Sequence, residues 1–274
     1  LCGTRIARKK KKIPYASKNA DLYDKAELLC YEEVARMPPF RRKTLVLIGP
    51  EGVGKRTLKQ RIINSDLSKF GSAIPHTTRP QRALEDNGVN YWFVDSEWME
   101  KEIREHKFLE YGNLKEYVYG THFDSIRDVF NQGKMCVLDC SPTALKILHN
   151  SSEFLPFVIF IAAPGIKQLA SYYDNGRMNN GTYSSRTLNQ QFDRQSSIRY
   201  SSRRARTLES LASLYEEEDL QQVLEESACM QRTYEKYIDL VIVNEDLDST
   251  FMKIIESLET LQTSHQWVPV NWIY

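Results

Sequence analysis

The sequence predicts an α/β fold in which a parallel sheet is flanked by helices and carries a phosphate-binding loop. Two observations support this prediction. Continuous apolar runs of strand length alternate along the chain with segments of helical periodicity. The first run, TLVLI, leads directly into IGPEGVGK, which has the spacing of a phosphate loop between a strand and a helix. Strands that alternate with helices form a parallel sheet covered on both faces.

Length and composition allow a sizeable hydrophobic core. The chain has 274 residues, 41% of them apolar, and a formal charge of +1, so charge gives no argument for nucleic acid or a membrane surface as a partner. No apolar run approaches the ~20 residues that a membrane span needs. Because there is neither an initiator Met nor a signal-peptide pattern, we expect a soluble chain that is a fragment of a longer protein.

Cysteine and histidine usage favours a reducing, cytosolic protein without a metal. The cysteines lack a C-x-x-C pair, and two of them lie in the apolar run MCVLDC, as buried reduced thiols do. The histidines show no spacing suited to zinc, so no metal site is expected. The five cysteines are Cys2, Cys30, Cys136, Cys140 and Cys229.

The elements follow in order. Residues 1–25 are a polar linker with the basic block Arg8–Lys12. The segment AELLCYEEVARM fits a short strand or a helix, and the prolines of MPPF end it. Buried strands are expected at 44–48, 134–140, 157–164 and 239–244, and helices at 55–66, 124–132, 142–148, 220–237 and 249–262. Residues 165–218 are rich in Ser, Arg, Asn and Tyr without apolar periodicity, which predicts a long, largely disordered insertion.

The phosphate loop departs from its pattern at one position. Gly49 and Gly54 allow backbone N–H groups to converge on a phosphate, and Lys55 would reach the outer phosphates. The next residue should carry a hydroxyl for Mg²⁺, but it is Arg56, which has no lone pair to offer. Thr57 comes one residue late and points about 100° away on a helix. Efficient magnesium-dependent transfer is therefore not expected, whereas weak metal-free nucleotide binding stays open.

Two further segments, IPHTTRPQRALEDNGVNYWFV and FLEYGNLKEYVYGTHFDSI, closely resemble guanylate kinases. The shared pattern is T-T-R-x-x-R, a Glu and a Tyr before an aromatic strand, then F-[IL]-E and Y-G-[ST]. The resemblance implies that two arginines and two tyrosines grip the phosphate of GMP, and that the Glu of F-[IL]-E helps to read guanine. The matching residues are Arg79, Arg82, Glu85, Tyr91, Glu110, Tyr119, Gly120 and Thr121.

The flanks resemble those of membrane-associated guanylate kinase (MAGUK) scaffolds. ELLCYEEVARMPPF and QWVPVNWIY are similar to two strands that pair to complete a split Src-homology-3 domain in that family. The resemblance implies a basic hook or linker at 1–25, a Src-homology-3 strand at 26–40, a guanylate-kinase-like domain at 41–264 and a closing strand at 265–274. The segment RQSSIRYSSRRARTLESLASLYEEEDL is most similar to the Stardust-type polarity scaffolds of the membrane palmitoylated protein subfamily.

Several residues that guanylate kinases use for catalysis are replaced in this sequence. Arg56 replaces the metal-binding hydroxyl, Ser141 replaces the second carboxylate after Asp139, and Pro75 replaces a serine that helps to read guanine. The lid that should bring arginines over ATP is the Ser- and Arg-rich insertion, which would not supply a preorganised site. Because phosphoryl transfer depends on positioning and charge neutralisation, we predict no catalytic residues, no cofactor and no enzyme activity. The alternative is an active guanylate kinase that phosphorylates GMP with ATP.

A grip for an anion remains. Arg79 and Arg82 offer charge-assisted donors, each worth about 1.5–3 kcal/mol when well formed, and the hydroxyls of Tyr91 and Tyr119 add two more. Because guanine recognition is weakened, a phosphopeptide is the favoured ligand. Two alternatives stay open: the arginines make structural ion pairs, or they hold a protein partner without phosphate.

The resemblance implies a scaffold in a cell-junction or polarity complex. Expected partners are Crumbs-like receptor tails and junction proteins, at the cytoplasmic face of the plasma membrane at apical junctions. An intramolecular contact between the Src-homology-3 strands and the kinase-like domain is also expected, and an open strand edge there offers a route to self-assembly. Nucleic acid is not an expected partner. A third hypothesis is a membrane-surface or nucleic-acid binder acting through Arg8–Lys12 and Arg194–Arg206.

The segment RQSSIRYSSRRAR also predicts targets for a basophilic kinase, with an unmodified linker as the alternative. Phosphorylation there would allow the segment to fold back onto Arg79 and Arg82. The four candidate sites are Ser196, Ser197, Ser201 and Ser202.

The C-terminal aromatic residues complete the sequence-based expectations. Trp267, Trp272 and Tyr274 are expected to be buried against a strand at Tyr31–Val34, because pairing stabilises two short strands. An exposed, partner-binding aromatic patch is the alternative.

Overall fold

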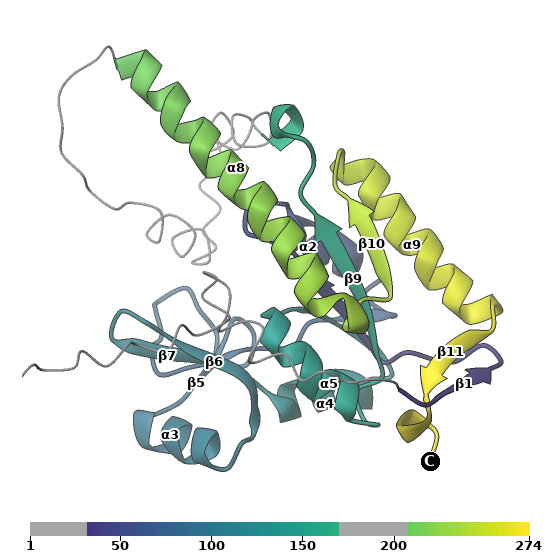
Figure 1. Cartoon of the computed structure of the whole chain (residues 1–274). Helices are drawn as coiled ribbons and strands as arrows, with labels where there is room; N and C mark the ends of the chain where they lie inside the picture. Colours follow the sequence, from purple (N-terminus) through teal and green to yellow (C-terminus); the bar gives the residue numbers. More distant parts are fainter. Residues whose placement is uncertain (1–31, 170–207) are drawn as a thin grey trace, which may run out of the picture. The chain divides into compact units, whose positions relative to one another are not determined.

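A five-stranded parallel sheet lies at the centre of the fold (Figure 1). The computed structural model describes residues 32–169 and 208–274, and the elements below belong to one unit, Glu33–Tyr274. The strands lie in the order β10-β9-β2-β8-β3, and each neighbouring pair is parallel. This confirms the predicted parallel sheet. Its strands are β2 (Thr44–Ile48), β3 (Phe70–Gly71), β8 (Met135–Asp139), β9 (Pro156–Ala162) and β10 (Leu240–Val243).

Helices cover both faces of this sheet. Alternate residues of each strand point to opposite sides, and both sets are apolar, so both faces have to be buried. Leu45 and Leu47 pack in one core cluster with side chains of α2 (Lys55–Ser65) and α9 (Leu247–Thr263). Val46 and Ile48 pack in a second cluster on the other face. That cluster includes side chains of α4 (Phe123–Asn131), α5 (Leu145–Asn150) and the last turns of α8 (Leu208–Tyr234).

A second sheet of four strands, with the segment between β4 and β5, carries the seven residues predicted to bind phosphate or a partner. Its order is β5-β4-β7-β6, with β6 and β7 forming an antiparallel hairpin. The short helix α3 (Ser96–Arg104) follows β5, and the Asp95 side chain caps it by accepting from Trp98 N at 2.7 Å. The sequence analysis did not predict this hairpin or α3. The strands are β4 (His76–Thr77), β5 (Trp92–Phe93), β6 (Phe108–Leu114) and β7 (Tyr117–His122).

Two short strands from opposite ends of the unit pair with each other. β1 (Val34–Met37) runs antiparallel to β11 (Gln266–Pro269). A strand before the domain thus meets a strand after it, and the assignment of both to a Src-homology-3 domain stays a prediction. Arg42 anchors this region, because its guanidinium donates to Gln266 Oε1 at 2.9 Å and lies 3.5 Å from Asp239.

The expected burial of the three terminal aromatic residues is wrong for two of them. Trp267 is 65% exposed and Tyr274 is 96% exposed. Trp272 is buried, but it donates Nε1–H to the His149 carbonyl oxygen at 2.8 Å and lies under Arg42. The partner strand also starts later than expected, at Val34. Strand alternation explains the exposure of Trp267, because it points away from the core that its neighbour Val268 enters, whereas Tyr274 lies beyond the strand at the end of the sequence.

The predicted boundary of the insertion is wrong at its C-terminal side. Helix α8 begins at Leu208, so residues 208–218 are helical instead of disordered, and the helix expected at 220–237 starts earlier. The segment LESLASLYEEEDL is rich in Leu, Ala and Glu, which are strong helix formers. Residues 170–207 of the insertion, with its four candidate serines and the block Arg194–Arg206, lie outside the described residues, as does Arg8–Lys12.

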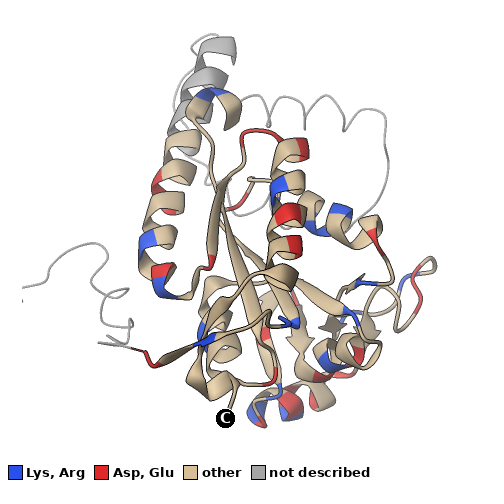
Figure 2. Ribbon diagram, turned by 90° about the vertical axis from the view of Figure 1, so that its right-hand side faces the viewer, with Lys and Arg blue, Asp and Glu red and all other residues tan. Residues whose placement is uncertain are grey.

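Charges of both signs are interspersed over the helices that the structure describes (Figure 2). This arrangement agrees with the near-zero formal charge of the whole chain. Among the described residues, no helix is both long and apolar enough to cross a membrane.

Candidate functional site

The loop between β2 and α2 depends on two glycines. Gly54 caps α2 with φ 84°, a left-handed conformation that glycine adopts without steric cost. Gly49 has φ 149°, and an added Cβ would lie 2.2 Å from the Ile161 carbonyl oxygen on β9. Asn244, at the end of β10, donates its amide N–H to the Val53 carbonyl oxygen at 2.8 Å. The loop is thus held at the carboxyl ends of the strands, where parallel sheets bind ligands.

The two cations of this loop contact the protein itself. Lys55 Nζ donates to the carbonyl oxygens of Gly49 and, at 3.1 Å, of Pro50. Arg56 Nε lies 3.9 Å from Asp139 Oδ2 at the end of β8. A guanidinium therefore lies beside the carboxylate, at the position where the loop pattern requires a hydroxyl ligand. Because it offers no lone pair, these residues do not fit a magnesium site.

Arg79 is enclosed by its neighbours on the second sheet. Its side chain is 6% exposed, and Nη2 lies 2.8 Å from Glu85 Oε1. Nη1 donates to the Pro80 carbonyl oxygen at 2.9 Å. Glu85 Oε2 accepts from Arg82 N at 3.1 Å, so one carboxylate contacts both predicted arginines. Within the described part of the chain, the buried Nε of Arg79 has no acceptor.

Two neighbouring aromatic rings lie close to the Arg79 guanidinium. Its Cζ lies 5.6 Å from the centre of the Tyr91 ring and 5.4 Å from that of Phe93. Burial by itself would lower the pKa of Arg79, but hydrogen bonds with Glu85 and Tyr119 outweigh burial and raise it. Burial also raises the pKa of Tyr91, whose ring contacts that of Tyr119 at 5.9 Å. Arg79 and Tyr91 therefore keep their protons at neutral pH and can donate to an anion.

Arg82 differs from Arg79 in its surroundings. Its side chain is exposed, and its backbone N–H, not its guanidinium, contacts Glu85. Among the described residues no hydrogen bond or ion pair of the Arg82 guanidinium is found. The two arginines of the motif are thus not equivalent, because one is enclosed and the other faces solvent.

Glu110 connects the second sheet to the central sheet. Its Oε2 accepts a hydrogen bond from Ser141 N at 2.8 Å, just beyond the end of β8. Burial raises the pKa of Glu110, and the charge of Asp139 adds to the rise, while the Ser141 hydrogen bonds oppose it. Glu110 lies opposite Thr121 in the β6–β7 register, and Tyr119 follows two residues away on the same face of β7. The fold therefore gathers Glu110, Tyr119 and Thr121 beside the end of the parallel sheet.

Comparison with known proteins assigns the family. The guanylate kinase family model matches residues 41–202. The chain belongs to the guanylate kinase family. Its relatives also include MAGUK proteins that match over the whole chain, which confirms the predicted resemblance to MAGUK scaffolds.

MAGUK p55 subfamily member 2 from Rattus norvegicus is 42% identical over 100% of this chain and 44% of its own length. Protein PALS2 from Homo sapiens is 39% identical over 100% of this chain and 45% of its own length. The chain thus spans less than half the length of these two relatives. Among solved structures, the guanylate kinase from Anaplasma phagocytophilum matches with a TM-score of 0.44 and 19% identity, covering 81% of this chain and 87% of that chain.

Two residues of this guanylate-kinase-like site were missed by sequence reasoning. Asn244 donates a hydrogen bond to the loop between β2 and α2. Its position, as a polar residue at the carboxyl end of a buried strand, could have indicated a site residue. Phe93 flanks Arg79, but nothing in the aromatic run YWFV distinguishes it from a core residue. The four predicted phosphorylation sites lie outside the described residues, so their position relative to this site stays a prediction.

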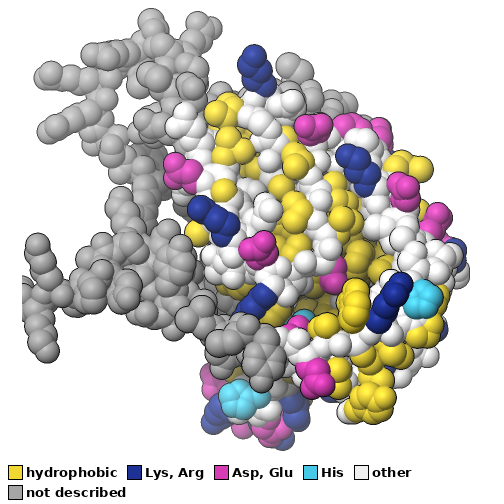
Figure 3. Space-filling model, turned by 45° about the vertical axis from the view of Figure 1, so that its right-hand side comes forward, with side chains coloured by type: hydrophobic (Ala, Val, Ile, Leu, Met, Phe, Trp, Pro, Cys, Tyr) yellow, Lys and Arg dark blue, Asp and Glu magenta, His cyan; other side chains and the backbone are white. Residues whose placement is uncertain are grey.

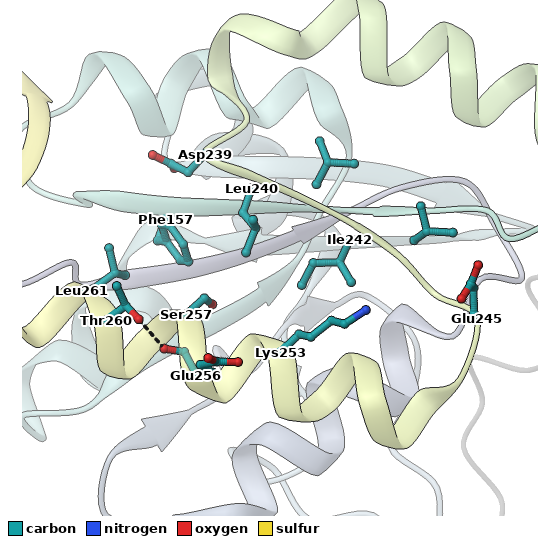
Figure 4. Close-up of a pocket in the computed structure, with 12 residues that line it drawn as sticks. Phe157, Asp239, Leu240, Ile242, Glu245, Lys253, Glu256, Ser257, Thr260 and Leu261 are labelled. Carbon is teal, nitrogen blue, oxygen red and sulfur yellow. Dashed lines mark hydrogen bonds between the residues drawn. The ribbon is translucent and has the colours of Figure 1, made fainter. Parts of the chain in front are cut away.

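A hollow elsewhere on the guanylate-kinase-like domain contains none of the predicted site residues. It lies between edge strand β10 and one side of α9, with a volume of about 630 Å³. Hydrophobic side chains gather on this face of the described chain (Figure 3), and Leu240, Ile242 and Leu261 lie around the hollow (Figure 4). Val241 and Val243 of β10 are 40% and 44% exposed.

Proposed function

We propose that this chain is a non-catalytic guanylate-kinase-like module of a MAGUK scaffold that binds protein partners. The observation that carries the proposal is the approach of Arg56 Nε to Asp139 Oδ2 at 3.9 Å. Phosphoryl transfer in phosphate-loop enzymes depends on Mg²⁺ held beside the phosphates. Here a permanent cation takes the position of the metal-binding hydroxyl and lies against the neighbouring carboxylate. Charge repulsion between the guanidinium and a divalent cation works against metal binding.

Two further contacts support the absence of catalysis. Lys55 is engaged with the carbonyl oxygens of its own loop, and Glu110 is engaged with Ser141. A nucleotide would have to break both sets of hydrogen bonds before either side chain could take its role in a guanylate kinase. Such rearrangement opposes the preorganisation on which catalysis depends.

The activity test compares the wild-type chain with Arg56→Ser. ADP formation from Mg·ATP is measured with and without GMP in a coupled assay. We expect no GMP-dependent turnover from either protein, because Ser141 still replaces the second carboxylate. Wild-type turnover within the roughly 1–100 s⁻¹ range of active kinases would refute the proposal.

We propose that the face around Arg82 is where a protein partner binds, with a phosphomonoester as the preferred anchor. Support comes from the exposed side chain of Arg82, whose backbone N–H contacts the same Glu85 carboxylate as the enclosed Arg79, and from the donors of Tyr91 and Tyr119. Through such partners the scaffold would reach the cytoplasmic face of a cell junction. Receptor tails and junction proteins remain the partners implied by the resemblance.

The binding test uses a phosphoserine peptide and its unphosphorylated counterpart, both measured by fluorescence anisotropy. We expect the phosphorylated peptide to bind at least tenfold more tightly, and Arg82→Ala to abolish the difference. Arg36→Ala, which removes an exposed arginine on β1, is the matched control and should bind like wild type. Equal affinity for both peptides would refute the preference for a phosphomonoester. The face around Arg82 would then bind a protein partner without phosphate.

A further inference from the structure

On one edge of the Arg79 guanidinium, only one of the two N–H donors has an acceptor among the described residues. Nε–H and Nη2–H lie on the same edge, and together they match two oxygens of a carboxylate or a phosphate. Glu85 Oε1 takes Nη2 at 2.8 Å, whereas the buried Nε has no acceptor within the described part of the chain. A buried donor without a partner is unfavourable. One of the two donors on this edge is therefore left without an acceptor from residues 32–169 and 208–274.

The guanidinium is fixed independently of Glu85. The Pro80 carbonyl oxygen accepts from Nη1, and the rings of Tyr91 and Phe93 lie 5.6 and 5.4 Å from Cζ. These contacts keep the donor edge in place when the carboxylate leaves. The side chains of Arg79 and Glu85 are 6% and 11% exposed, so a ligand that takes both donors of this edge has to replace Glu85.

We propose that Glu85 is a built-in competitor of the ligand, and that a phosphomonoester binds by displacing Glu85 Oε1 from Arg79. Two phosphate oxygens then accept from Nε and Nη2. This inference rests on the proposed function, because it assumes an anionic ligand at this face. It adds a specificity-determining residue that sets how strongly charged the ligand has to be.

The competition favours a dianion over a monoanion. A ligand carboxylate would replace one singly charged group by another and gain only the Nε contact. A phosphate dianion brings a second charge and a third oxygen, and the exposed Arg82 is a further cation in the same loop. Glu85 Oε2 accepts from Arg82 N, so the displaced carboxylate stays nearby and repels the ligand. Wild-type affinity for phosphate is thus lowered by an amount that neutralising Glu85 removes.

The test measures Kd values of inorganic phosphate, a phosphoserine peptide and acetate for wild type and Glu85→Gln by calorimetry at pH 7.5. We expect Glu85→Gln to bind both phosphate probes about tenfold more tightly, and to bind acetate weakly where wild type does not bind it. The matched control is Asp86→Asn, which removes one exposed charge from the same loop without contacting Arg79. Its affinities should change less than twofold.

A second measurement uses the wild-type chain and needs no variant. Phosphate should shift the NMR signals of the Arg79 Nε–H group and of the Glu85 carboxyl carbon in the same titration. Signals that stay in place while phosphate binds would overturn the displacement.

The other outcomes separate this proposal from the one before it. If Glu85→Gln binds phosphate as weakly as wild type or more weakly, Glu85 stabilises the loop and does not compete with the ligand. This result would overturn the competition but not the scaffold function. Preference of wild type for the phosphoserine peptide would still support the partner site in that case. Absence of phosphate binding by both proteins would overturn the inference together with the phosphate anchor.

Discussion

Ser141 N donates a hydrogen bond to Glu110 Oε2 over 2.8 Å, and this contact joins the second sheet to the end of β8. The resemblance to guanylate kinases implies that both positions belong to a nucleotide site. Ser141 replaces a carboxylate of the guanylate kinase pattern, and Glu110 is the residue that the resemblance assigns to guanine. In this structure the Glu110 carboxylate instead accepts a hydrogen bond that connects the two sheets.

Replacing Glu110 by Gln should stabilise the protein slightly at neutral pH. Burial raises the pKa of Glu110, so the native state binds its proton more strongly than the unfolded state does. This group therefore costs stability as pH rises from the unfolded pKa, about 4.3, through the folded pKa. The Gln amide oxygen still accepts from Ser141 N without that cost. We expect a Tm at pH 7 that is unchanged or about 1–3 °C higher by calorimetry; a clear loss would show that the carboxylate charge is needed.

The two motif arginines should differ in their effect on folding. Arg79→Ala leaves the mostly buried Glu85 carboxylate without its partner, which costs about 3–5 kcal/mol. Arg82→Ala removes an exposed guanidinium and should change the unfolding free energy by less than about 0.5 kcal/mol. Urea denaturation of both variants measures the difference. Equal losses would contradict the assignment of Arg79 as the enclosed member of the pair.

Acidification should destabilise the second sheet through His76. This residue is 8% exposed, and its ring lies 5.3 Å from the rings of Trp98 and of His122. Burial lowers the pKa of His76 to about 4, and the charge of His122 adds to this effect. The charges of Asp124 and Glu102 oppose it. Because the unfolded chain takes up the proton first, near pH 6.5, stability is lost as pH falls from there towards 4.

We expect a loss of about 1–2 kcal/mol between pH 7.5 and pH 5, measured by urea unfolding. His76→Phe keeps an aromatic ring against Trp98 and should flatten this part of the pH profile. An unchanged slope in that variant would assign the acid sensitivity to other groups.

The C-terminal segment should depend on one tryptophan and not on the other. Trp272 is buried, donates to His149 and lies 4.7 Å from the Arg42 guanidinium, so Trp272→Ala should cost about 3–5 kcal/mol. Trp267 is 65% exposed, and Trp267→Ala should change stability by less than about 0.5 kcal/mol. Thermal unfolding of the two variants gives the comparison, and similar Tm losses would contradict it.

The central sheet could be predicted because its strands are continuously apolar. Runs such as TLVLI are buried on both faces, so their pattern is independent of the exact partner. The second sheet could not be predicted in this way, since β4 and β5 have two residues each and β6 carries exposed polar positions. The start of helix α8 was predicted too late, because its first turns, LESLASLY, follow directly on the Ser- and Arg-rich insertion and were assigned to it.

The sequence by itself determined the chemistry available at each position. It placed glycines at 49 and 54, removed the metal-binding hydroxyl at Arg56, and kept the motif by which the family is recognised. Tertiary structure alone decided which of these groups are engaged: Arg56 approaches Asp139, Glu110 bonds to Ser141, and Glu85 takes half of the Arg79 edge. The reason is that hydrogen bonds and ion pairs depend on distances of a few ångströms, which packing sets and which spacing along a chain does not encode.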